Sequence, residues 1–120
     1  MKNFTKYIFE SRHFSVENKR VKPTAFVPWP YFECSVANIE SLEENEIWPL
    51  GDVIGNENRG KAATARGDFD EIDLSAARLS LQNAEPPERH WHIIGWDTGS
   101  KDTQKAQALE FAPLVELHVR

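Results

Sequence analysis

The sequence contains a single cysteine, Cys34, among its 120 residues. One thiol cannot form a disulfide within the chain, which excludes the small secreted proteins held by disulfide frameworks. No run approaches the roughly 18 consecutive apolar residues of a membrane-spanning helix. No apolar block follows Lys2 and Lys6, as it would in a secretory signal peptide. We therefore expect a cytoplasmic protein with no membrane partner.

Glycine-rich nucleotide motifs are also missing. The six glycines form neither the Gly-x-x-x-x-Gly-Lys-Ser/Thr spacing of a P-loop nor the Gly-x-Gly-x-x-Gly of a dinucleotide site. The acidic run 68–73 does not follow the ligand order of an EF-hand and is predicted to be a solvated edge or a helix start. The sequence therefore implies no cofactor.

Positive charge is scarce except at the start of the chain. The net charge is −5, yet residues 1–22 hold six Lys or Arg against two Glu. Such an arm can bind an anionic partner or dock on the acidic body of its own chain. An acidic protein is a poor candidate for binding duplex DNA, so duplex DNA is not the expected partner.

The hydrophobic fraction of 40% is enough to fill the core of one domain, predicted over 1–120. Pro23, Pro28 and Pro30 disfavour regular structure, so residues of about 1–30 are expected to form an extended, basic N-terminal arm. Beyond it, apolar periodicity predicts strands over 32–39, 76–83, 90–96 and 115–119, and a helix over 101–112.

The predicted class is α+β, with a small antiparallel sheet packed against one principal C-terminal helix. A short helix near 41–48 is expected, with a capping box from Ser41 to Glu44 and an end at Pro49 and Gly51. Residues 55–67 are rich in turn formers and are expected to form a mobile loop. In the 101–112 helix, a buried stripe is predicted at Ala108, Phe111, Ala112 and Val115, with Leu109 alongside.

The stretch 89–96 holds the most chemically capable side chains. As a strand it places His90 and His92 on one face, where two imidazoles can bind a metal ion only if a third ligand joins them. The alternatives are histidines in hydrogen bonds at the wet face of the sheet, and an acid–base or ligand-binding role. No metal is predicted; His90 and His92 are the candidates if one binds.

Five segments together carry a resemblance. They are Ser-Arg-His-Phe-Ser (11–15), Arg-Val-Lys-Pro-x-Ala-Phe (20–26), Glu-Ile-Trp-x-x-Gly (46–51), Ala-Arg-Gly-Asp (65–68) and Pro-Pro-x-Arg-His-x-x-Ile-x-Gly-Trp (86–96). The chain resembles a family of short bacterial proteins of uncharacterised function. The resemblance covers nearly the whole chain as one domain and implies a bacterial cytoplasmic or mobile-element setting, with no known activity, cofactor or partner.

The polar residues of these segments are typical of a binding pocket. They predict a non-catalytic binding or accessory module, in which the 12–26 arm and the 89–96 strand form a cationic, aromatic groove for an anionic group on a protein or nucleic acid. One alternative is a small enzyme acting on a phosphate-bearing or nucleotide substrate, with His90 as acid–base. Another is a structural subunit of an oligomer. The candidate ligand-binding residues are Arg12, His13, Arg20, Lys22, Arg66, Arg89 and His90.

Overall fold

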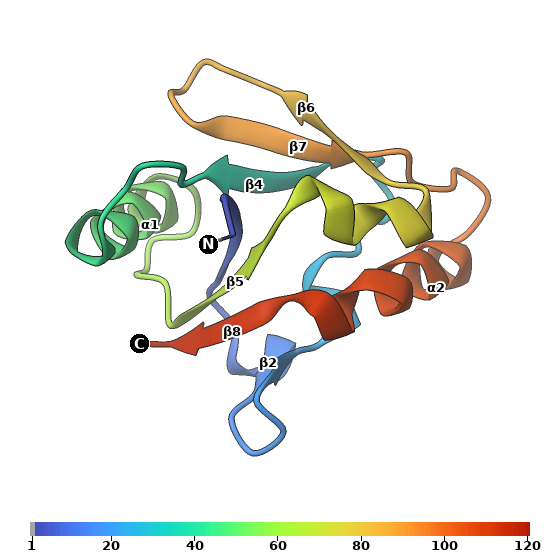
Figure 1. Ribbon diagram of the computed structural model, residues 1–120, viewed down its shortest axis with the longest axis horizontal. Helices are drawn as coiled ribbons and strands as arrows, with labels where there is room; N and C mark the ends of the chain where they lie inside the picture. Colours follow the sequence, from blue (N-terminus) through green and yellow to red (C-terminus); the bar gives the residue numbers. More distant parts are fainter. Residues whose placement is uncertain (1) are drawn as a thin grey trace.

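The fold is built around β1 (Phe4–Ile8), which lies near the middle of a six-stranded antiparallel sheet (Figure 1). The computed structural model describes residues 2–120. The strand order is β6–β7–β4–β1–β5–β8. The other members are β4 (Cys34–Asn38), β5 (Ala65–Phe69), β6 (Ser80–Asn83), β7 (His90–Ile94) and β8 (Glu116–Val119). The predicted α+β class with an antiparallel sheet is confirmed.

Helices cover both faces of this sheet (Figure 1). On one face, α2 (Lys101–Phe111) and the 3-10 helix η3 (Glu71–Ala77) enclose the larger core, which includes Phe69 and Ile93. On the other face, α1 (Glu44–Asn58) packs a smaller core with Tyr7 and Ala37. Successive strand residues alternate between these faces, so His90 and His92 lie opposite Trp91 and Ile93. Neither α1 nor α2 is long and apolar enough to cross a bilayer, and no other helix within residues 2–120 is.

The C-terminal predictions are confirmed in most details. The predicted 101–112 helix is α2, followed by the short 3-10 helix η4 (Ala112–Leu114) and then β8. The four residues of the predicted stripe are buried, as expected for residues that share one face of a helix. Leu109 is an exception, because its side chain is 62% exposed and points to solvent. The predicted hairpin of strands is also present as β6 and β7, although residues 76–77 belong to η3.

The prediction of a short helix ending at Pro49 and Gly51 is wrong. α1 has Glu43 rather than Ser41 as its N-cap, with the capping box formed by Glu43 and Glu46, and its 15 residues make it longer than α2. The Glu46 carboxylate accepts from the Glu43 backbone N–H at 3.0 Å. Ile47, Gly51 and Gly55 are the buried positions, spaced four apart so that they face the sheet. A Cβ at Gly51 would come within 2.5 Å of the Tyr7 ring, so glycine lets the helix approach β1.

The prediction of a mobile loop over 55–67 is also largely wrong, because residues 55–58 belong to α1 and residues 65–67 to β5. All five residues of β5 are buried. Two of them are charged, Arg66 and Asp68, and they satisfy each other at 3.1 Å from Nε to Oδ1. Gly67 faces the larger core, where Val21 and Val115 leave no room for a Cβ.

The N-terminal arm starts later than predicted, since residues 4–8 form a strand inside the sheet. Residues 11–31, here called the arm, run over the larger core through η1 (Ser11–His13), β2 (Phe14–Ser15), β3 (Arg20–Val21) and η2 (Pro23–Ala25). Phe26 anchors the arm. It is fully buried, with its ring centroid 4.7 Å from that of Phe111 and 6.1 Å from that of Phe69.

Candidate functional site

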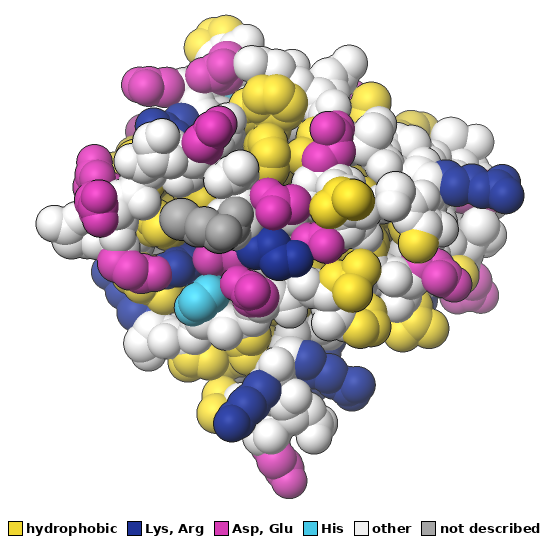
Figure 2. All heavy atoms as spheres, in the orientation of Figure 1, with side chains coloured by type: hydrophobic (Ala, Val, Ile, Leu, Met, Phe, Trp, Pro, Cys, Tyr) yellow, Lys and Arg dark blue, Asp and Glu magenta, His cyan; other side chains and the backbone are white. Residues whose placement is uncertain are grey.

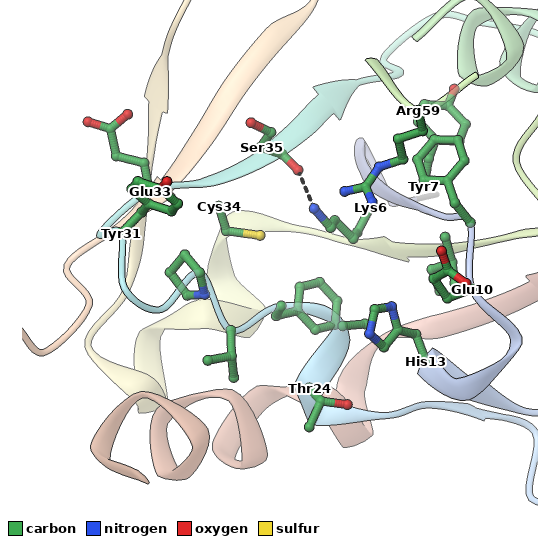
Figure 3. A pocket seen from close by; sticks show the side chains of 16 residues that line it. Lys6, Tyr7, Glu10, His13, Thr24, Tyr31, Glu33, Cys34, Ser35 and Arg59 are labelled. Carbon is green, nitrogen blue, oxygen red and sulfur yellow. Dashed lines mark hydrogen bonds between the residues drawn. The ribbon is translucent and has the colours of Figure 1, made fainter. Parts of the chain in front are cut away.

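The first cavity opens where β1 and β4 separate. These strands pair only at Phe4 with Asn38 and Thr5 with Ala37, whereas β1 stays paired with β5 over its whole length. Lys6 spans the gap, because its Nζ donates to the Ser35 carbonyl at 3.0 Å. The resulting strand-gap cavity has a volume of about 350 Å³ (Figure 3).

The strand-gap cavity has an apolar wall and a charged rim. Ile8, Phe26 and Cys34 belong to the wall, and all three are buried. Burial raises the pKa of the Cys34 thiol, so this thiol stays protonated at neutral pH and fills space rather than acting as a nucleophile. Figure 3 shows Lys6 from β1, Cys34 from β4 and His13 from η1 pointing toward the same space. The acidic, basic and histidine residues of the lining are Lys6, Glu10, His13, Glu33 and Arg59.

A second cavity of about 330 Å³ lies between the arm and the start of α2. It shares three lining residues with the strand-gap cavity, namely His13, Thr24 and Val27. Its remaining lining residues are Arg12, Trp29, Lys101 and Lys105. No acidic residue belongs to this lining, so we call it the cationic cavity.

The cations of the cationic cavity also lack acidic partners elsewhere. Arg12, Lys101 and Lys105 have no carboxylate within ion-pairing distance in residues 2–120. By contrast, Lys2 and Lys61 each hold a carboxylate at 2.6 Å. Converging like charges raise the local positive potential, and a bound anion relieves their repulsion.

Helix α2 aims its two lysines at the cavity through ordinary helical spacing. Lys101 and Lys105 are four residues apart and therefore lie on one face. Ser100 caps the helix, its side chain accepting from the Thr103 N–H at 3.1 Å. Between the lysines, Gln104 is fully buried and its Nε2 donates to the carbonyls of Tyr31 at 3.1 Å and Asp97 at 3.0 Å. This bond ties the arm to the helix that carries the lysines.

His13 stands at the junction of the two cavities. Its pKa lies below the usual value for an imidazole, first because burial disfavours the charged form and then because Arg12 and Lys6 repel a further positive charge. His13 is therefore neutral at pH 7, and can offer one donor and one acceptor nitrogen.

Of the predicted binding residues, only Arg12 and His13 line a cavity. Arg20 and Lys22 lie in and just after β3 and line neither. The Lys22 backbone N–H instead donates to the His13 carbonyl at 2.9 Å, which holds η1 in position. Lys22 thus supports the site through its backbone.

Arg66 lies on the opposite face of the sheet, in an ion-pair cluster beneath α1. Its side chain is 2% exposed and contacts the carboxylates of Asp68 and Glu44. The guanidinium carbon also lies 4.8 Å from the centroid of the Trp48 ring. Every face of Arg66 is thus occupied by its own protein, which is the environment of a structural charge.

Arg89 and His90 line neither cavity, although His90 contacts Ser35 of the strand-gap lining. Arg89 Nη1 donates to the carbonyls of Asn38 and Glu40, each at 3.0 Å, and so secures the end of β4. His90 Nε2 lies 3.3 Å from Ser35 Oγ, and its ring meets that of His92 at 4.7 Å between centroids. The structure does not bring these residues together with Arg12 and His13.

His92 has an acidic neighbour, because its Nδ1 lies 2.9 Å from Glu33 Oε2. The pKa of His92 is nevertheless lowered, mainly by burial, with the Glu33 charge opposing. No group of three or more His, Cys, Asp or Glu side chains in residues 2–120 is arranged to hold a metal ion. The arrangement is two neighbouring histidines on one face of β7, with His90 beside Ser35 and His92 beside Glu33.

The sequence reasoning missed most of the residues that line the two cavities. Lys101 and Lys105 carried a usable pattern, since they lie four residues apart on one face of the predicted 101–112 helix. Lys6 and Arg59 carried none, because only the separation of β1 and β4 brings them to one space.

Comparison of the chain with protein-family models, with curated proteins and with solved structures found no match.

Proposed function

We propose that this protein is a small cytoplasmic, non-catalytic binding module that holds an anionic group in the cationic cavity. The observation that carries the proposal is the convergence of Arg12, Lys101 and Lys105 on one space without any carboxylate. Phosphate and carboxylate oxygens are the groups that satisfy such donors, because charge-assisted hydrogen bonds are the strongest available to them.

The charge distribution of the whole chain supports this location. The net charge is −5, and Figure 2 shows acidic side chains over the centre of one face and the side near α1, with basic ones around the β2 end. In a protein of negative net charge, a cluster of cations without acidic neighbours attracts anions to one place, while the rest of the surface repels them.

A titration with inorganic phosphate at constant ionic strength, followed by amide chemical shifts, tests the proposal. The expected shifts gather at residues 11–13, 24–29 and 101–105. Arg12→Gln and Lys101→Gln should each weaken binding about tenfold, the size of one lost charge-assisted hydrogen bond. Arg20→Gln is the matched control, because Arg20 is exposed on the same arm and lines neither cavity. Equal weakening in the control would contradict a specific site.

A second candidate function is hydrolysis of a phosphate ester, with His13 rather than His90 as acid–base. The observation that favours it is the neutral His13 imidazole, which lines both cavities. His90 lines neither cavity. Release of inorganic phosphate from a nucleoside monophosphate by the wild type, lost in His13→Gln, would support it. No release by either protein would leave the binding function as the proposal.

A further inference from the structure

We propose that the ligand is a nucleoside phosphate, with its phosphate in the cationic cavity and its base in the strand-gap cavity. This inference rests on the proposed function, which supplies the anion site, and adds the identity of what the anion is attached to.

The two cavities are adjacent, which is the first support. His13, Thr24 and Val27 form part of both linings, so a ligand seated in one borders directly on the other. Volumes of about 350 and 330 Å³ each suit a small organic molecule rather than a bare ion. A phosphate alone would leave the strand-gap cavity filled with water.

The two cavities differ in chemistry in the way that the two ends of a nucleotide differ. The cationic cavity offers only positive groups, which suits a phosphate. The strand-gap cavity sets the carboxylates of Glu10 and Glu33 against the cations Lys6 and Arg59, over a wall that includes Ile8 and Phe26. These charges balance, so the lining suits an uncharged ring with donors and acceptors along its edge better than a second anionic group.

Lys6 is placed to read such an edge. Its ammonium uses one proton for the Ser35 carbonyl at 3.0 Å and keeps two for an acceptor in the cavity. Figure 3 shows the Lys6 side chain reaching across the strand gap toward Ser35, so a planar ring held in the cavity meets its ammonium.

Each cavity has an exposed aromatic side chain in its lining. Tyr31 lines the strand-gap cavity with 73% of its surface exposed, and Trp29 lines the cationic cavity at 37% exposed. Large exposed aromatic rings beside cations are typical of sites that stack nucleic-acid bases, since every base presents a flat face. The Gln104 bond to the Tyr31 carbonyl holds this part of the arm in place without a ligand.

Calorimetric titrations of the full chain with four classes of probe test the inference. The probes are inorganic phosphate, ribose 5-phosphate, the four common nucleoside monophosphates, and an acetylated Asp-Glu dipeptide amide. The expected result is that at least one nucleoside monophosphate binds about tenfold or more tightly than ribose 5-phosphate, the scale of one base stacked on an aromatic ring.

Variants locate that advantage. Tyr31→Ala and Lys6→Met should remove most of the preference for the nucleotide while leaving the affinity for inorganic phosphate unchanged. Phe32→Ala is the matched control, because Phe32 is the neighbouring exposed aromatic, at 45%, and lines neither cavity. Melting temperatures of all three variants check that the fold is intact.

The remaining outcomes separate this inference from the proposed function. Phosphate binding that is lost in Arg12→Gln, with nucleotides no tighter than ribose 5-phosphate, overturns the nucleotide and leaves the anion site standing. Tighter binding of the acidic dipeptide than of any nucleotide also overturns it, in favour of a peptide ligand. Absence of binding by every probe overturns both proposals together.

Discussion

Gln104 holds Tyr31 from 73 residues away, its Nε2 donating to the Tyr31 carbonyl at 3.1 Å. The same nitrogen donates to the Asp97 carbonyl at 3.0 Å, while its Oε1 has no hydrogen-bond partner in residues 2–120. This buried amide therefore fixes the arm against α2, and with it the position of Trp29, which lines the cationic cavity with Lys101 and Lys105.

Gln104→Leu should lower the free energy of unfolding by about 1–3 kcal/mol, because it leaves two partly buried carbonyls without their donor. It should also weaken phosphate binding, since the arm is released from the helix. Gln107→Leu is a matched control: Gln107 Nε2 donates to the carbonyls of Gly95 and Ala77, and neither belongs to the arm. Urea unfolding and phosphate titration of both variants provide the measurements. Equal loss of phosphate affinity in the two would contradict the positioning role of Gln104.

Arg66→Met should be the most destabilising change of a charged residue, by about 3–5 kcal/mol, because it leaves Asp68 buried without its cation. Glu44→Gln removes the other partner of Arg66, but that carboxylate is 66% exposed and its loss should cost under about 1 kcal/mol. Chemical unfolding of the two variants measures the contrast. Similar losses in both would show that exposure does not govern the strength of these pairs.

The pH dependence of stability should carry a contribution from His13. The pKa of this imidazole is lower in the folded protein, so below about pH 6.5, the ordinary value, the unfolded chain binds more protons than the folded one. Stability is therefore lost as the pH falls through the folded pKa. His92 adds a loss of the same sign.

His13→Gln should accordingly reduce the loss of unfolding free energy as the pH falls from about 7.5 to about 5.5. This range spans the ordinary pKa of an imidazole, about 6.5. His118→Gln serves as the comparison, because the His118 ring lies beside Asp68 on the other face of the sheet. A pH dependence identical in wild type and His13→Gln would rule out this contribution.

Gly55→Ala should destabilise the protein by about 1–3 kcal/mol, the usual cost of overpacking. A Cβ at this position would overlap the Lys61 carbonyl oxygen and come within 2.6 Å of the Phe9 ring. Asn56→Ala, one residue along and exposed, should be neutral or slightly stabilising, because alanine is the better helix former. Thermal unfolding of both distinguishes close packing of α1 from an effect of helix propensity, which would favour alanine at both positions.

The sequence was sufficient to predict those strands and helices that bury one face and expose the other. β4, β7, β8 and α2 all lie within the predicted ranges, because their apolar residues repeat at the period of a strand or of a helix. It was insufficient for α1 and β5. Pro49 and Gly51 normally end a helix, yet burial of Ile47 and close approach to Tyr7 carry α1 beyond them. Likewise, Arg66 and Asp68 fit the interior of β5 only because they neutralise each other.

By itself, then, the sequence determined the class of fold, the C-terminal helix and the presence of cations in the arm, all of which follow from local periodicity and composition. Only the tertiary structure decided which cations act together. Arg12 and His13 meet Lys101 and Lys105, from the far end of the chain, because Gln104 and Phe26 fasten the arm to α2. Arg66 binds carboxylates of its own chain, and Arg89 binds backbone carbonyls. The physical reason is that electrostatic and hydrogen-bond partners are chosen by proximity in space, and long-range strand pairing sets that proximity.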